Sequence, residues 1–226
     1  MDRYGVIQRS IDKISGENYL EIGVLGGHLF FRIKAKRKVA VDPHFSLSRK
    51  MRLRYPLRSL NARYFEMTSD AFFSQIRLPF QFDVVFVDGL HTYQQVLRDV
   101  ENSLSRLTQN GIIVMHDCNP VSVSAAYPAA SYEEVCSLNL PGFNDEWSGD
   151  VWKAVSFLRS QRKDLRVFVL DCDYGLGIVR RGMPESILEM SEASIEKLSY
   201  SDLEANRVEF LNLKAPNYFD EFLATL

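Results

Sequence analysis

The segment Glu21–Gly27, which reads Glu-Ile-Gly-Val-Leu-Gly-Gly, decides the fold class. It closes an apolar run that predicts a strand over Asn18–Val24, and it puts glycines where that strand should turn into a helix. Glycine lets the backbone turn tightly and approach a ligand closely, and a helix N-terminus offers unpaired amides. The segment therefore predicts the first strand–turn–helix unit of an α/β domain with a ligand beside the turn. A plain structural turn also favours glycine and remains the alternative.

Four further segments have the composition of strands and alternate with helix-like segments. This alternation is typical of a parallel sheet with crossover helices. The predicted strands are Lys38–Asp42, Ala62–Met67, Phe82–Asp88 and Ile112–His116. Thr92–Leu107 has the helical period of apolar residues, and Asn110-Gly111 is expected to end that helix.

The last two predicted strands, Leu165–Leu170 and Tyr174–Arg180, flank the turn-like Asp171–Asp173 and should pair antiparallel. The sequence thus predicts an α/β fold: a Rossmann-like, seven-stranded, mostly parallel sheet with an antiparallel strand at one edge and helices on both faces. Residues 118–149, rich in Pro, Ser, Asn and Gly, are too long for an ordinary connection and are expected to form a lid. The predicted domain spans 1–182 with this insertion, and 183–226 should form a C-terminal helical extension.

Composition narrows the class of protein. The chain has 226 residues, 46% of them hydrophobic, and a net charge of −2, so it is globular and lacks the basic surface that duplex nucleic acid requires. Its basic stretch, Arg49–Arg63, is interpreted as a solvated helix face. No apolar run reaches the ~20 residues that span a bilayer. Met1–Gly16 lacks the apolar core of a signal peptide, and three scattered cysteines suit a reducing compartment. We expect a cytoplasmic protein.

Asp42 strengthens the ligand interpretation of the glycine turn. It ends the second predicted strand about 20 residues after the turn, where an acidic side chain can bind the two ribose hydroxyls of a nucleoside. A capping carboxylate is the structural alternative. Leu25 stands where a pyrophosphate would require a second glycine, which disfavours a nicotinamide enzyme. No Gly-x-x-x-x-Gly-Lys-Ser/Thr run occurs, which excludes a P-loop nucleotide hydrolase.

In combination, these motifs resemble the class I S-adenosylmethionine (SAM)-dependent methyltransferases. The resemblance covers residues 18–180 and rests on Tyr19–Gly23 with Gly27, on Val41-Asp42, on Phe82–Gly89 and on Gly111–Val114. Within that superfamily the chain is most similar to the small O-methyltransferases of the cephalosporin-hydroxylase-like and macrocin-methyltransferase-like groups. It departs from the usual Gly-x-Gly spacing, as the catechol and caffeoyl types also do.

The resemblance implies a cofactor site for SAM. The glycine turn would hold the methionine part, Asp42 the ribose, and the region of Ser69 and Asp70 the adenine. The predicted cofactor-binding residues are Glu21, Gly23, Gly27, Asp42, Ser69, Asp70 and Asp88.

Carboxylates follow the fourth and fifth predicted strands. Open α/β sheets bind ligands at the carboxyl ends of their strands, so Asp88 and Asp117 should face the transferred methyl group, with His91 and His116 between them. Two carboxylates with imidazoles can hold a divalent cation or act as a general base. We therefore expect His91 and Asp88 to be catalytic residues. Helix capping by Asp88 and a satisfied buried His116 are the structural alternatives.

Two mechanisms stay open at this site. In metal-dependent members of the resembling groups, the fourth-strand acid and an adjacent pair after the fifth strand bind Mg²⁺. Asp88 and Asp117 match and are the predicted metal ligands. The neighbours of Asp117 are His116 and Cys118, however, whereas Mg²⁺ prefers oxygen. The alternative is a metal-free site with His91 as the base.

The predicted function is SAM-dependent methyl transfer to a hydroxyl of a small molecule, either a sugar or a secondary metabolite. N-methylation and a non-catalytic SAM-fold binding or assembly protein are the alternatives. The expected partner is a small-molecule acceptor, with neither nucleic acid nor membrane insertion, and a homo-oligomer is left open.

Overall fold

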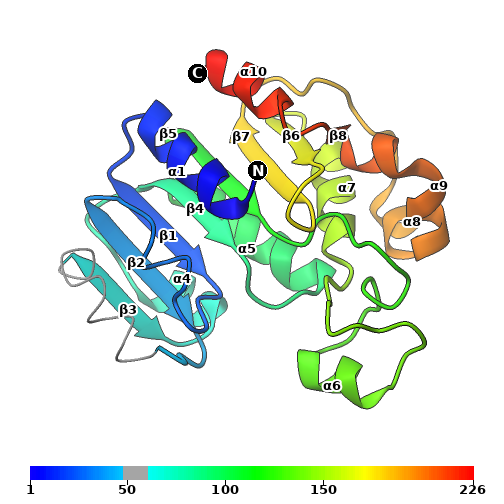
Figure 1. Cartoon of the computed structure of the whole chain (residues 1–226). Helices are drawn as coiled ribbons and strands as arrows, with labels where there is room; N and C mark the ends of the chain where they lie inside the picture. Colours follow the sequence, from blue (N-terminus) through cyan, green and yellow to red (C-terminus); the bar gives the residue numbers. More distant parts are fainter. Residues whose placement is uncertain (48–60) are drawn as a thin grey trace.

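The computed structural model describes residues 1–47 and 61–226. These residues form one eight-stranded sheet in the order β3-β2-β1-β4-β5-β7-β6-β8 (Figure 1). The strands are β1 (Asn18–Ile22), β2 (Arg37–Asp42), β3 (Ala62–Glu66), β4 (Phe82–Val87), β5 (Leu107–Met115), β6 (Leu165–Leu170), β7 (Leu176–Arg181) and β8 (Leu213–Lys214). The basic stretch interpreted as a helix face lies almost entirely outside the described residues.

The predicted fold class is confirmed. Strands β1 to β5 pair in parallel, and β7 runs antiparallel to both β5 and β6. The eighth strand, β8, was not predicted. It is two residues long, comes from the C-terminal segment and pairs parallel with β6, which puts it at the edge of the sheet. The antiparallel β7 lies between β5 and β6.

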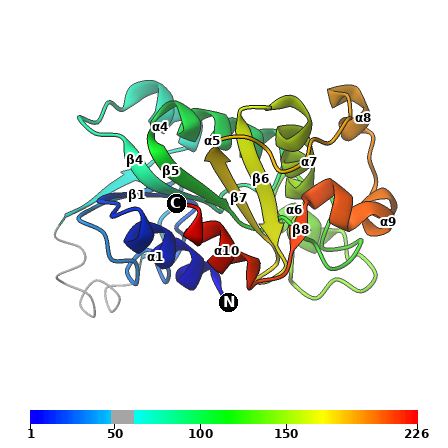
Figure 2. The same cartoon turned by 90° about the horizontal axis from the view of Figure 1, so that it is seen from above.

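Helices cover both faces of the sheet (Figure 2). One core contains side chains of α4 (Ser69–Gln75), α5 (Tyr93–Ser105), α7 (Val151–Gln161), α8 (Glu192–Glu196) and α9 (Tyr200–Leu211). The other contains side chains of α1 (Arg3–Lys13) and α10 (Tyr218–Ala224). Successive strand residues alternate between the two cores because their side chains point to opposite faces of the sheet. Among the helices of the described residues, none combines the length and apolarity needed to cross a bilayer.

The glycine turn after β1 does not open a helix, contrary to the prediction. Residues 28–32 form successive turns, and the Phe31 amide donates to the Gly27 carbonyl at 3.0 Å. Phe30, Phe31 and Ile33 are all fully buried. Consecutive helical residues point in different directions, so one helix face cannot bury this run. The Lys38 ammonium closes the segment by donating to the Phe30 and Ile33 carbonyls at 2.7 and 3.2 Å.

The prediction that Asn110-Gly111 ends a helix is also wrong. Helix α5 ends at Ser105, and β5 begins at Leu107, so both residues lie inside a strand. The register with β4 shifts between Phe82 and Val84. A Cβ on Gly111 would lie 2.5 Å from Leu107 Cγ, so the glycine allows close packing at an irregular point of the strand.

The C-terminal segment fixes the start of the predicted lid. Arg207 of α9 donates hydrogen bonds to the side chain of Asn119 and, at 2.8 Å, to the Pro120 carbonyl. On the opposite face of the sheet, Arg9 of α1 pairs with Asp220 of α10. The extension thus contacts both the lid and the N-terminal helix. The domain boundary at residue 182 stays a prediction.

Gly23 offers a test of how tightly β1 and β4 are packed at their carboxyl ends. Its φ is +82°, and an added Cβ would lie 1.9 Å from the Asp88 carbonyl oxygen. Gly142 also has a positive φ, +73°, but nothing lies within 4 Å of its Cβ position. We expect Gly142→Ala to lower the free energy of unfolding by about 1–2 kcal/mol and Gly23→Ala by about 3 kcal/mol or more. Urea titration measures both, and equal losses would contradict the packing argument.

Candidate functional site

A cavity of about 870 Å³ opens at the carboxyl ends of β1, β2, β4 and β5. It gathers most of the predicted site residues, which come from segments far apart in the sequence. Those that line it are Glu21, Gly23, Asp42, Ser69, Asp88, His91 and Asp117. Gly27 and Asp70 do not line it. Gly27 has a φ of +74°, and its Cβ position is blocked by Leu47 and Phe31 at 2.8 Å, so it serves the turn itself.

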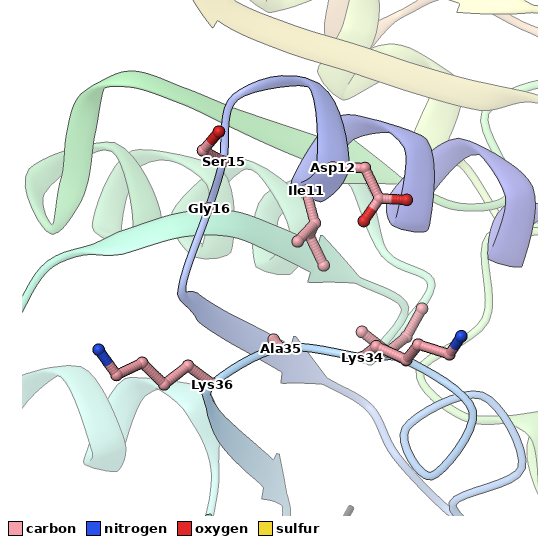
Figure 3. A pocket seen from close by; sticks show the side chains of 8 residues that line it. Ile11, Asp12, Ser15, Gly16, Lys34, Ala35 and Lys36 are labelled. Carbon is pink, nitrogen blue, oxygen red and sulfur yellow. The ribbon is translucent and has the colours of Figure 1, made fainter.

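A second hollow lies at the amino ends of β1 and β2, between the end of α1 and the segment that leads into β2 (Figure 3). Its polar side chains are Asp12, Ser15, Lys34 and Lys36. Lys36 is paired with Glu17 at 2.9 Å. The hollow lies at the end of the sheet opposite to the one where α/β folds bind ligands.

The Asp42 carboxylate holds the glycine turn in place. Its Oδ2 accepts hydrogen bonds from the backbone amides of Val24 (2.7 Å) and Leu25 (2.8 Å), and its Oδ1 accepts one from the amide of His44 (2.7 Å). These amides therefore bind Asp42, where the sequence had suggested helix-terminal amides facing a ligand. A carboxylate has about four acceptor positions, so roughly one remains directed to the cavity.

Glu21 is a buried carboxyl group at the end of β1. It is 2% exposed, and its Oε2 accepts a hydrogen bond from the Tyr19 hydroxyl at 2.6 Å. Burial raises the pKa of Glu21 to about 8, against the lowering effect of the Tyr19 bond. The group is therefore protonated and neutral at pH 7. A neutral carboxyl group is a hydroxyl donor as well as an acceptor, unlike an ionised one.

Asp99 of α5 lines the cavity but was not predicted. It is 1% exposed, and its Oδ2 has no hydrogen-bond partner among the described residues. Its Oδ1 accepts from Gln95 Nε2 at 3.0 Å, and the same nitrogen reaches Ser69 Oγ at 3.2 Å. Burial raises the pKa of Asp99 to about 6. Only the folded arrangement reveals this residue, because in sequence it is one acid on an amphipathic helix.

The two carboxylates after β4 and β5 meet around an imidazole. His116 Nδ1 lies 2.6 Å from Asp117 Oδ2 and 3.1 Å from Asp88 Oδ1. Burial alone would lower the pKa of His116, but Asp88, Asp117 and Asp173 raise it well above its usual range. Asp88 responds in the opposite sense: burial opposes its ionisation, yet His116 and His91 hold its pKa below the usual range.

His91 lies beside the same cluster and lines the cavity. Its Nδ1 lies 2.7 Å from the Trp147 carbonyl, so this nitrogen must carry the proton. Its Nε2 lies 3.4 Å from Asp117 Oδ2 and 3.7 Å from Asp88 Oδ1. Burial lowers and the two carboxylates raise its pKa, with a net increase. The imidazole is thereby oriented with one nitrogen directed at the carboxylates and the cavity.

Arg3 and Asp173 complete the cluster and were missed by the sequence interpretation. Arg3 Nη1 lies 3.2 Å from Asp88 Oδ2, and its Nη2 lies 2.8 Å from Asp173 Oδ1. Asp173 had a usable signal, because it belongs to the predicted turn between the last two strands. Arg3 had none, since it is 85 residues away from Asp88 in the sequence.

The segment predicted as a lid covers this side of the cavity. It contains one helix, α6 (Tyr132–Ser137), and a small apolar cluster around Val135 and Trp147. The C-terminal end of the segment contacts the site directly, because Ser148 Oγ donates a hydrogen bond to Asp117 Oδ1 at 2.8 Å. Tyr132 and Trp147 line the cavity.

The donors of this cluster do not fit Mg²⁺. Asp88, His116 and Asp117 place one ligand atom each within 4.8 Å of one another, so a small cation would have room. Mg²⁺, however, requires near-octahedral oxygen coordination. The third member here is an imidazole that hydrogen-bonds both acids. The assignment of Asp88 and Asp117 as metal ligands from the sequence stays a prediction, which the imidazole between them does not favour.

Comparison with known proteins finds a methyltransferase domain in part of the chain. Residues 20–118 match a protein-family model described as a methyltransferase domain. No curated protein matches the chain in sequence. The matched segment includes the glycine turn, Asp42, Asp88 and Asp117.

Solved structures share the fold over most of the chain. The S-adenosylhomocysteine (SAH)-bound methyltransferase PaMTH1 of Podospora anserina is 18% identical, with a TM-score of 0.56 over 80% of this chain and 78% of that one. A putative caffeoyl-CoA O-methyltransferase from Staphylococcus aureus is 17% identical, with a TM-score of 0.53 over 80% and 85%. The O-methyltransferase TomG of Streptomyces achromogenes, solved with SAM, is 14% identical, with a TM-score of 0.53 over 78% of each.

At these identities the structural likeness establishes the fold, which is the Rossmann-like fold of class I methyltransferases. The family match adds the class of protein. The resemblance inferred from the sequence motifs is therefore confirmed, and the chain is an enzyme of the methyltransferase class.

The neutral state of Glu21 predicts how stability depends on pH. Between the ordinary pKa of 4.5 and the folded-state pKa of about 8, the unfolded chain loses this proton while the folded chain keeps it. The free energy of unfolding should therefore fall as pH rises through this window. Glu21→Gln should remove that decline and exceed the wild type at pH 8 by about 2–5 kcal/mol. Urea unfolding at pH 5 and pH 8 tests this, with Glu221→Gln on the exposed face of α10 as control. Parallel wild-type and Glu21→Gln curves would contradict it.

Proposed function

We propose that this enzyme transfers the methyl group of SAM to a hydroxyl oxygen of a small molecule, with His91 as the general base. The observation that carries the proposal is the tautomer of His91. Its Nδ1 donates to the Trp147 carbonyl at 2.7 Å, which leaves Nε2 free to accept a proton at the cavity.

The cavity residues fit the parts of SAM. Bound SAM supplies a methyl group on a positively charged sulfur, which departs as the neutral thioether of SAH. The acidic lining complements that charge, and the remaining acceptor position of Asp42 suits a ribose hydroxyl. The unpartnered Oδ2 of Asp99, beside Ser69, suits the exocyclic amino group of adenine. Asp99 thus joins Ser69 in the proposed adenine site, while Asp70 lies outside the cavity.

The chemistry of the cluster favours an oxygen acceptor over nitrogen. A hydroxyl becomes a strong nucleophile only when its proton is removed, whereas a neutral amine already carries its lone pair. His91 Nε2 takes the hydroxyl proton as the oxygen–methyl bond forms and the carbon–sulfur bond breaks. Asp88 and Asp117, at 3.7 and 3.4 Å, stabilise the resulting imidazolium. The site therefore contains the group that O-methylation needs and N-methylation does not.

The lid supports a small acceptor. Tyr132 and Trp147 line the cavity, and aromatic rings can stack on sugar or planar rings. We accordingly propose a sugar or a secondary metabolite as the acceptor class. All three cysteines are free thiols, which accords with the proposed cytoplasmic location. Incubation with SAM and matched hydroxyl and amine acceptors, followed by mass spectrometry, tests the proposal; methylation of amines alone would overturn it.

The role of His91 predicts a defined pH profile. Only neutral imidazole accepts a proton, and the flanking carboxylates raise the pKa of His91 above its usual 6.5. The rate should therefore fall as pH decreases through a value above 6.5. His91→Ala should lower turnover by about 10²–10⁴-fold and remove this acidic limb. Its control is His44→Ala, whose side chain is 98% exposed. Steady-state kinetics from pH 5 to 9 measure both, and an unchanged profile in His91→Ala would refute the assignment.

The assignment of Asp99 predicts discrimination between purine bases. A carboxylate oxygen accepts from the 6-amino group of adenine but repels the 6-oxo group of hypoxanthine. The wild type should bind SAH more tightly than S-inosylhomocysteine by about 1–3 kcal/mol, and Asp99→Ala should lose most of that preference. Calorimetric titration of both ligands provides the measurement. Asp70→Ala, whose side chain lies outside the cavity, is the matched control and should keep the preference.

A further inference from the structure

The cluster at the ends of β4 and β5 brings three carboxylates together: Asp88, Asp117 and Asp173. We infer that Arg3 and the Nδ1–H group of His116 take the place that a divalent cation would occupy there, so that the enzyme works without a bound metal. This inference deepens the proposed function and rests on it only for the identity of the acceptor site. Its support is the occupancy of each carboxylate oxygen.

Both oxygens of Asp88 already have partners from the chain. Oδ1 lies 3.1 Å from His116 Nδ1, and Oδ2 lies 3.2 Å from Arg3 Nη1. Both oxygens of Asp117 are used as well, Oδ2 by His116 Nδ1 at 2.6 Å and Oδ1 by Ser148 Oγ at 2.8 Å. A metal ion would have to compete with these groups for the same carboxylate oxygens.

Arg3 is held by more than one contact. Its backbone amide donates to Asp173 Oδ2 at 2.6 Å, its Nε to the same oxygen at 3.0 Å and its Nη2 to Asp173 Oδ1 at 2.8 Å. Only Nη1 extends to Asp88. A guanidinium keeps its charge at every physiological pH, and the fork geometry fixes that charge beside the reacting groups. The first turn of α1 therefore supplies a permanent positive charge to the acceptor site.

Asp173 acts as the support for this charge. It lies in the turn between β6 and β7 with a φ of +48°, a conformation that aspartate tolerates better than most residues. Its side chain is 15% exposed, and it also lies 3.5 Å from His116 Nε2. Arg3 is thus positioned by Asp173, and it acts as a positioning residue through Asp88.

Metal binding measured directly separates this inference from the proposed function, because it requires neither SAM nor acceptor. The probe is Mn²⁺, which accepts both oxygen and nitrogen ligands and is observed by electron paramagnetic resonance. The full-length wild type should show no site tighter than about 1 mM. The variant Arg3→Met/His116→Asp removes the guanidinium and restores a paired acid, and should bind Mn²⁺ at least about tenfold more tightly. Arg3→Met alone gives the same comparison if the double variant does not fold.

Arg9→Gln is the control for the Arg3 variants, and two results would overturn the inference. Arg9→Gln alters an exposed residue of the same helix that pairs with Asp220, and it should leave Mn²⁺ binding unchanged. One Mn²⁺ per wild-type chain, lost in Asp117→Asn, would overturn the inference. Failure of both Arg3 variants to bind Mn²⁺ any better than the wild type would overturn it too, because these groups would then not be what excludes the metal.

Discussion

The convergence of Asp88, Asp117 and Asp173 at one end of the sheet is the constraint on which the rest of this structure depends. Three carboxylates that all contact one imidazole repel one another strongly unless positive charge or hydrogen-bond donors lie between them. Here the chain itself supplies these groups through His116 and Arg3. The acceptor site, the N-terminal helix and the β6–β7 turn are therefore one electrostatic unit.

The backbone conformation at two of these acids is also unusual. Asp117 has a φ of +58° and Asp173 one of +48°, so two of the three carboxylates sit in the left-handed region. Such conformations persist where the surroundings over-determine them. Hydrogen bonds hold both side chains. Ser148, near the end of the lid, donates to Asp117, and three donor groups of Arg3 donate to Asp173. The lid and α1 are thus attached by these acids to the end of the sheet where the cavity lies.

The cofactor side follows a related principle, in which one side chain serves both stability and binding. Asp42 accepts three backbone hydrogen bonds that shape the glycine turn, and it still lines the cavity. Glu21 and Asp99 are buried deeply enough that their pKa values rise to about 8 and about 6. A buried carboxyl without a compensating partner destabilises the fold. The cavity therefore keeps polar groups that a purely structural core would replace.

The sequence by itself determined the succession of β1 to β7 along the chain and seven of the residues that line the cavity. Short apolar segments mark β1 to β7 in the sequence. A parallel strand that is buried on both faces is a near-continuous apolar run. Acids such as Asp42 and Asp88 could be placed because strand ends converge at one sheet edge. The short β8 and the early start of β5 could not be predicted, since two residues carry no period and a register shift has no local signature.

Only the tertiary structure decided which charges meet. No local pattern links Arg3 to Asp88, because their contact depends on how α1 packs on the sheet and not on either neighbourhood in sequence. The same holds for Asp99, which lines the cavity only because α5 docks beside it. Sequence periodicity records which face of an element is buried. It does not record which polar groups lie opposite one another across a cavity, because these contacts join segments that the chain brings together only when folded.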